Sequence, residues 1–210
     1  MVRGQGIYQN FGIAGATPFD ELVLDVLGIA PYKSGGRGLV GYYDSRDNEF
    51  KPGQGWLMSL TNLAYRESLG GEQDFDVYRL DFHHCIPFGK GSVIAVRQLN
   101  HLTDGAPTQN LSPIQLRGYK VWQYTRKFMS QIESEARLKL AARWTATVFA
   151  GVGCTYGNGK NCSESATLFP MAGAGVQYVL KPQVGIVLNL EYAQGKDGNN
   201  GVILRTGYAF

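Results

Sequence analysis

The chain has 210 residues, a net charge of +3 and 18% charged residues, below the usual share of about a quarter. So small a positive charge does not by itself argue for nucleic-acid binding, and no run approaches the roughly 18 apolar residues of a membrane-spanning helix. The first residues, MVRGQGIYQN, lack the apolar core of a signal peptide, so we expect a cytosolic chain, or a mature or truncated form.

Alternation of apolar and polar residues with a period of two is the strongest regular pattern along the chain, and it predicts β-strands. The predicted strands are, in chain order, Arg37–Ser45, Trp56–Arg66, Phe75–Phe88, Ser92–Leu102, Ser130–Arg143, Thr145–Cys154, Leu168–Leu180, Val184–Gln194 and Val202–Phe210. Most have about the 9–11 residues of a tilted membrane strand. Only residues 19–28 and 120–129 suggest a helix.

Two of these strands show the alternation most clearly. In the segment 184–194, one face carries Val184, Ile186, Leu188, Leu190 and Tyr192, and the other carries Gly185, Val187, Asn189, Glu191 and Ala193. In the segment 130–143, one face carries Gln131, Glu133, Glu135, Arg137, Lys139 and Arg143, opposite Ile132, Ala136, Leu138, Leu140 and Ala142. Helical periodicity would scatter these charges around a cylinder, whereas a strand places them on one face, so the pattern favours a strand.

The connections between the predicted strands alternate between short and long. Short turns are expected at 88–91, 143–144 and 181–183, and longer loops at 67–74, 103–129, 154–167 and 195–200. The long connection 46–55, on the short-turn side, is the exception. Short turns on one rim and long loops on the other are typical of an antiparallel transmembrane β-barrel, here with about 8–10 strands in an all-β chain. A soluble β-sandwich also alternates, but its outward faces need more charge than this chain has.

Several patterns are compatible with chemistry but are better explained by structure. His83, His84 and Cys85 alternate across a strand with no second ligand pair nearby, so we predict no metal and no cofactor. The pair Glu133 and Glu135 shares its face with Arg137, which favours a structural ionic network over an acid/base dyad. No serine nucleophile elbow is present, so we expect no enzyme.

Cys154 and Cys162 bracket the loop CTYGNGKNC, in which glycine and asparagine let the two ends meet. A disulfide there would imply an oxidising compartment, and two reduced thiols are the alternative.

With this architecture in place, several motifs resemble the C-terminal half of the barrel of the Omp85 superfamily, the bacterial surface antigen D15 family that includes BamA and TamA. The resemblance covers residues 36–210. GLVGYYDSRDNEFKPGQGW (38–56) resembles a family strand and its turn, and LGGEQDFDVYRLDFHHCIPF resembles the next loop and strand. Leu116-Arg117-Gly118-Tyr119 matches the Arg-Gly-Phe/Tyr lid motif, and Glu135-Ala136-Arg137 matches a Glu-x-Arg on the strand after the lid. The terminal Tyr208 and Phe210 match the C-terminal signal used in barrel assembly.

The resemblance implies that the long loop 103–129 folds back into the barrel, where Arg117 pairs with lumenal carboxylates. A guanidinium makes charge-assisted bonds with carboxylates, and Glu133 and Glu135 are the expected acceptors, beside Arg137. The family strand that follows often carries Phe-x-Asp-x-Gly, whose Asp receives the lid Arg. Here the matching stretch is Phe149 to Gly153, with Gly151 in place of the Asp.

The resemblance also implies a domain organisation. Residues 1–36 form an N-terminal segment in which 21–31 can add a tenth strand, and residues 37–210 form the barrel region with lid loop 103–129. The family barrel has sixteen strands preceded by POTRA domains, so we expect a small closed barrel, a homodimer that shares one barrel, or a truncated chain that lacks its N-terminal barrel half.

The function implied is insertion or translocation of other proteins at the outer membrane of a Gram-negative bacterium. The expected partners are membrane lipids and client outer-membrane or secreted proteins, without nucleic acid. The alternative is a structural barrel or small pore that anchors a partner domain and has no insertase activity.

Overall fold

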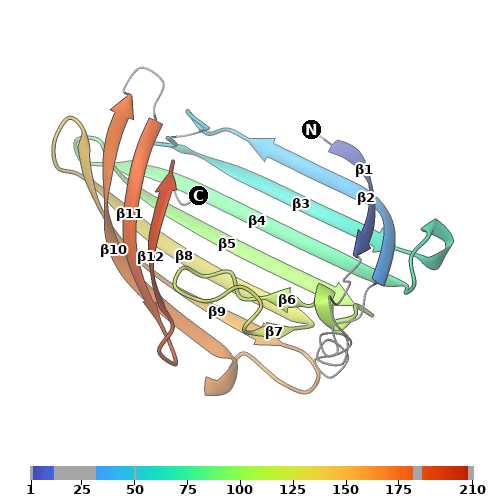
Figure 1. Ribbon diagram of the computed structural model, residues 1–210. Coiled ribbons are helices and arrows are strands. Elements are labelled where there is room, and N and C mark those ends of the chain that lie inside the picture. Colours follow the sequence, from blue (N-terminus) through green and yellow to red (C-terminus); the bar gives the residue numbers. More distant parts are fainter. Residues whose placement is uncertain (1, 12–31, 50, 182–185, 208–210) are drawn as a thin grey trace, which may run out of the picture.

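The computed structural model describes residues 2–11, 32–49, 51–181 and 186–207, and these form one large antiparallel sheet with a small hairpin against it (Figure 1). The ten strands of the sheet lie side by side in chain order: β1 (Val2–Phe11), β2 (Tyr32–Asp44), β3 (Gly55–Tyr65), β4 (Phe75–Phe88), β5 (Ser92–Asp104), β8 (Phe128–Lys139), β9 (Trp144–Tyr156), β10 (Leu168–Lys181), β11 (Ile186–Gly195) and β12 (Asn200–Thr206). A second sheet joins β6 (Ser112–Pro113) to β7 (Thr125–Arg126). Short 3-10 helices lie at η1 (Glu67–Leu69), η2 (Thr108–Asn110) and η3 (Ser165–Thr167).

The nine predicted strands are confirmed, with ends that shift by a few residues. The fifth ends at Lys139 rather than Arg143, because Leu140 and Ala141 turn back and donate their N–H groups to the Trp144 carbonyl at 3.0 and 3.1 Å. The start of the eighth and the last residues of the ninth lie outside the described residues.

The predicted helices and the predicted tenth strand are not confirmed. The helix suggested at 120–129 is wrong: the segment forms a turn at Trp122 (φ 67°), then β7 and the start of β8. Its backbone pairs with the segment that contains β6 instead of forming helical hydrogen bonds. The Tyr124 carbonyl accepts a hydrogen bond from the Ile114 N–H at 3.0 Å. The other suggested helix, 19–28, and the suggested tenth strand, 21–31, lie outside the described residues. The tenth strand of the sheet is β1, which pairs with β2 from Val2 opposite Gly41 to Phe11 opposite Tyr32.

The sheet is not closed into a barrel. Its order begins at β1 and ends at β12, and no pairing joins these two strands within the described ranges. The expectation of a small closed barrel is therefore corrected. An eight-stranded barrel is just wide enough to be filled by its own side chains, so a ten-stranded one would leave little room for the hairpin that lies on the concave face.

The two faces of the sheet have opposite chemistry, as the alternation predicted. On β8 the concave face carries Gln131, Glu133, Glu135 and Arg137, each at most 3% exposed. The convex face carries Ile132 and Leu138 in the open, and β11 and β12 likewise expose Leu190, Tyr192, Val202 and Leu204. Polar side chains are thus buried and apolar ones exposed, which is the reverse of a soluble sheet.

The connections also follow the predicted alternation (Figure 1). The links β4–β5 and β8–β9 are short and share one rim, while the links β3–β4, β5–β8 and β9–β10 at the other rim are longer. The long connection 46–55, which lies on the short-turn side, is explained by its contacts with the concave face. Asp47 accepts the N–H groups of Gly53 and Gln54, and the Pro52 carbonyl accepts a hydrogen bond from Arg137 on β8 at 3.1 Å, so this loop folds inward over the concave face. Among the described residues, no helix is long and apolar enough to cross a membrane.

Candidate functional site

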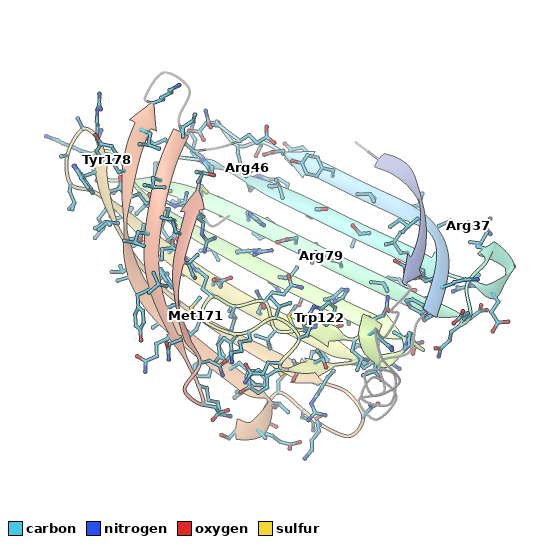
Figure 2. The ribbon with its side chains drawn as sticks, in the orientation of Figure 1. Arg37, Arg46, Arg79, Trp122, Met171 and Tyr178 are labelled. Carbon is cyan, nitrogen blue, oxygen red and sulfur yellow. A yellow bond between two sulfur atoms is a disulfide. The ribbon has the colours of Figure 1, made fainter. Side chains whose placement is uncertain are left out.

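The segment predicted as a lid loop leaves the sheet at the end of β5 and returns at β8. Its connecting part, residues 105–127, is called the lid below. The lid contains η2 and the β6–β7 hairpin, and it lies on the concave face of the sheet rather than beyond the rim (Figure 1). Figure 2 shows Trp122 in the lid, on the concave side of the sheet. The lid therefore brings its tip, residues 115–123, close to side chains of strands that are distant in sequence.

Arg117 is the most heavily bonded side chain of the lid. Its Nη1 donates to Glu135 Oε2 at 2.6 Å and to Glu191 Oε1 at 3.2 Å, and its Nε donates to Glu133 Oε2 at 3.2 Å. The arginine is 8% exposed and the three glutamates are at most 3% exposed. Bonds between charged groups in so dry a place are stronger than at a surface, because water does not compete for them.

The three glutamates are themselves held by neighbouring cations. Arg137 Nε donates to Glu135 Oε1 at 2.7 Å, and Arg205 Nη2 donates to Glu191 Oε2 at 3.1 Å. The result is an alternating row of charges that runs from β8 through the lid to β11 and β12. We call these six residues the lid network: Arg117, Glu133, Glu135, Arg137, Glu191 and Arg205. Within it, positive and negative charges are equal in number, so burial is compensated.

An aromatic ring and a row of glycines let Arg117 come this close to the wall. The guanidinium lies over the Phe149 ring, with Cζ 3.5 Å from the ring centroid, which adds a cation–π contact. A Cβ at Gly151 would lie 3.0 Å from Glu133 Cγ, and one at Gly153 would lie 2.8 Å from Ile114 Cδ1. These glycines on β9 leave the space that the lid and the glutamate occupy.

Gly118 and Tyr119 fix the other side of the lid tip. Gly118 has φ +85°, a left-handed conformation that favours glycine, and a Cβ added there would lie 3.2 Å from the Ala193 Cβ. The Tyr119 hydroxyl donates to the Pro170 carbonyl at 2.6 Å and accepts the Lys196 N–H at 2.8 Å. Burial raises the pKa of Tyr119 above its ordinary value, so this hydroxyl keeps its proton.

Apolar packing completes the contact between the lid and the sheet. Ile114, Leu116 and Tyr119 are buried against side chains from β5, β8, β9, β10 and β11. The wall residues of this cluster are Leu99, Met129, Phe149, Phe169, Met171 and Ala193. Fully burying a side chain of this size contributes about 1.5–3 kcal/mol, so apolar burial by the lid is comparable in importance to its ionic contacts.

Two parts of this site were not predicted from the sequence. Glu191 on β11 receives the lid arginine together with Glu133 and Glu135, so a third carboxylate is present although Gly151 replaces the usual Asp. The alternation of residues 184–194 did place Glu191 on the polar face of its strand, and this pattern could have identified it as an acceptor. The glycines of β9 were noticed only as a departure from a motif, whereas their role is to make space.

The remaining predicted residues lie away from the lid network. Cys154 and Cys162 form a disulfide with a Cα–Cα distance of 5.5 Å, which ties the last residues of β9 to the middle of the β9–β10 loop. His83 Nε2 lies 2.7 Å from Asp81 Oδ1 on the wall, and the described part of the chain holds no group of three or more residues able to bind a metal ion. Tyr208 and Phe210 lie outside the described residues.

Comparison with known proteins adds no family to these observations. No protein-family model matches the sequence, and no curated protein matches it.

Proposed function

We propose that this chain is part of the wall of an outer-membrane β-barrel of the Omp85 type, which assists the insertion or translocation of other proteins, with the lid and Arg117 as its internal latch. The observation that carries the proposal is the reversed chemistry of the sheet together with a lid bound to its polar face. A sheet that exposes apolar side chains on one face and holds charges on the other suits a barrel wall, with lipid outside and a polar lumen inside.

The convex face supports a membrane location. Leu60, Ile132, Leu190, Val202 and Leu204 are all between 46% and 72% exposed and come from strands across the sheet. In water an apolar surface of this extent would be a site of association or aggregation. In lipid it is the expected surface of a transmembrane strand, and the nine strands of the sheet other than β12 have 10–14 residues, long enough to span when tilted.

The open edges support a protein partner. Backbone N–H and C=O groups without partners cost several kcal/mol each in hydrocarbon, so a sheet of this kind needs another strand at each edge. That strand can come from a second copy of the chain, from an N-terminal barrel half with its POTRA domains, or from a client polypeptide. Transient occupation of an edge by a client strand is the step that would assist insertion.

The latch role is tested by complementation in cells that depend on this protein. Arg117→Ala should abolish or strongly reduce function, while heat-modifiable migration on gels stays as in the unaltered protein because the sheet pairing does not involve Arg117. The matched control is Arg143→Ala in the β8–β9 turn at the opposite rim. Normal complementation by Arg117→Ala would show that the lid is not a latch.

A structural barrel or small pore that anchors a partner domain is the second candidate, and the extent of lid anchoring favours it, since a lid held by three carboxylates suits a permanent plug. Planar-bilayer conductance that does not respond to added client strands would support this candidate. Protein mass in detergent adds an independent constraint, because a mass of two chains would indicate a shared barrel.

A further inference from the structure

A cavity of about 380 Å³ lies between the lid tip and the inner side of β12, the last strand of the sheet. Residues 115–120 of the lid form one wall, and Asn200, Gly201, Ile203 and Arg205 of β12 form another. Arg97 on β5 and Glu133 on β8 contribute to the base. The cavity therefore borders the free edge of the sheet at the place where the lid network ends.

The charges that line this cavity are mostly positive. Four cationic side chains contribute to it, and Glu133 is the acidic residue of the lining. The four are Arg97, Arg117, Lys120 and Arg205. Arg97 and Arg117 are already engaged, by Asp81 and by the three glutamates of the lid network. Lys120 and Arg205 have donor capacity left: within the described residues no carboxylate contacts Lys120, and the buried Nε of Arg205 has no acceptor.

From Gly201 onward, strand β12 faces this cavity with every second residue. It pairs with β11 on one side, from Leu188 opposite Thr206 to Gln194 opposite Asn200, and it has no other sheet neighbour in the part of the chain that the structure describes. Gly201, Ile203 and Arg205 point inward, whereas Val202 and Leu204 are about 70% exposed on the convex face. A strand added to this edge would continue the same alternation, with its inward side chains next to the cavity.

We propose that the free edge of β12 binds a β-strand that carries an acidic side chain on its inward face, opposite Arg205, and apolar side chains on its outward face. The proposal rests on the proposed function, in which a strand joins this edge, and adds the chemistry of that strand. A carboxylate in the cavity would accept hydrogen bonds from Arg205 and from Lys120 and would balance the charge of Lys120. An opposite-charge pair directly across two strands is also the favourable cross-strand arrangement.

The composition of β1 argues against the chain's own first strand as this partner. Val2–Phe11 has the sequence VRGQGIYQNF, which contains one arginine and no acidic residue. Pairing of β1 with β12, within one chain or between two copies, would place an uncharged or positive residue beside Arg205. The charge of the cavity therefore favours a strand other than β1, one that brings an acidic side chain.

The test uses the full chain in detergent and fluorescent peptides of about nine residues. In the first peptide, apolar residues alternate with threonine, and one inward position holds glutamate. A second peptide holds glutamine there, a third holds lysine, and a fourth moves the glutamate by one position so that it faces outward. We expect the first peptide to bind about five- to tenfold more tightly than the glutamine peptide, and the lysine and shifted peptides to bind more weakly still. Added salt should reduce the preference for glutamate.

Variants of the chain test whether the preference for the glutamate peptide arises from the cavity. Arg205→Gln should remove the difference between the glutamate and glutamine peptides, and Arg205→Lys should restore part of it. Arg143→Gln, in the turn at the opposite rim, is the matched control and should leave the difference unchanged. Equal binding of the glutamate and glutamine peptides to the unaltered chain would overturn the inference while leaving edge pairing in place. Failure of all four peptides to bind would overturn edge pairing as well, and the inference with it.

Discussion

The concave face has two regions that are built differently. Under the lid, the charged side chains that the lid network takes from β8 and β11 are buried: Glu135 and Glu191 are fully buried at the side chain, and Arg137 is 3% exposed there. On β4 and β5, Asp81 binds Arg97 and His83, which are 17% and 13% exposed at the side chain, and Arg79, which is 38% exposed. The same kinds of ion pairs thus occur in a dry setting under the lid and, at Arg79, in a setting open to water, which we call the wet region.

The difference shows what the lid does to the wall. A buried pair owes its strength to the absence of water, and the loss of one partner leaves an uncompensated charge. An exposed pair loses little when one partner is removed, because water replaces it. By burying these ion pairs, the lid strengthens the bonds that hold it on the sheet. The following substitutions test this contrast, from the largest expected effect to the smallest.

Arg117→Met should have the largest effect. It leaves three buried glutamates with fewer cations, so the free energy that holds the lid on the wall should fall by about 3–5 kcal/mol. Amide exchange at Ile114 and Gln115 should accelerate accordingly, while amides of β9 and β10 stay protected. Arg79→Met on the wet region is the comparison and should change stability by about 0–1 kcal/mol. Equal effects of the two variants would show that lid burial does not strengthen the network.

The sequence predicts which side chains of a strand face inward, but it does not predict which side chains of distant strands meet. Period-two alternation identifies Glu133, Glu135 and Glu191 as inward side chains, because a strand places alternate residues on one face. Alternation does not reveal that Glu133 and Glu191, on strands separated by β9 and β10, meet at one arginine. That meeting depends on how deeply the lid sits, which is set by the space at Gly151 and Gly153.

The resemblance to a lid motif located Arg117 and two of its acceptors, since a local motif carries its own geometry. The strand β1 was not predicted, and of the expected alternatives the small closed barrel was wrong. Glycine and polar residues dominate Val2–Phe11, so its strand propensity is weak, and its place is determined by pairing with β2 rather than by its own pattern. Closure of the sheet is a property of strand number, tilt and partners, none of which a single strand encodes.

Removal of the disulfide by the double substitution Cys154→Ser and Cys162→Ser should have the next largest effect. The bond spans eight residues and ties the β9–β10 loop, whose Ser165 carbonyl accepts a hydrogen bond from Lys196 Nζ at 2.6 Å. Loop-closure entropy predicts a loss of about 2–3 kcal/mol in the stability of this rim. Hydrogen exchange should rise at Thr167 and not in the β3–β4 loop of the wet region. Unchanged exchange at Thr167 would mean that other contacts hold the loop.

Gly153→Ala tests the space under the lid. The added Cβ would lie 2.8 Å from Ile114 Cδ1 and 3.1 Å from Leu116 Cδ1, so both lid side chains must shift. Overpacking of this kind costs about 1–3 kcal/mol, and the ends of flexible side chains place the cost at the lower end. Gly41→Ala on β2 is the control, because its nearest atom would be the Leu60 carbonyl oxygen at 3.9 Å. The midpoint of urea unfolding in detergent measures both, and a midpoint for Gly153→Ala no lower than that for Gly41→Ala would contradict the space argument.

Tyr119→Phe should have the smallest effect, and it separates the polar anchor of the lid tip from its apolar one. The ring still packs against Phe169, but the bonds to the Pro170 carbonyl and the Lys196 N–H are lost, at a cost of about 1–2 kcal/mol. The variant also predicts a pH dependence. Burial raises the pKa of Tyr119 in the docked lid above its value in a free lid, so the contribution of the hydroxyl is fully present below about pH 10 and is lost as the pH rises through the docked value. Lid amide exchange, corrected for its intrinsic pH dependence, should therefore accelerate in alkali in the unaltered protein and not in Tyr119→Phe. The same alkaline acceleration in both proteins would assign the effect to another group and leave Tyr119 with a packing role alone.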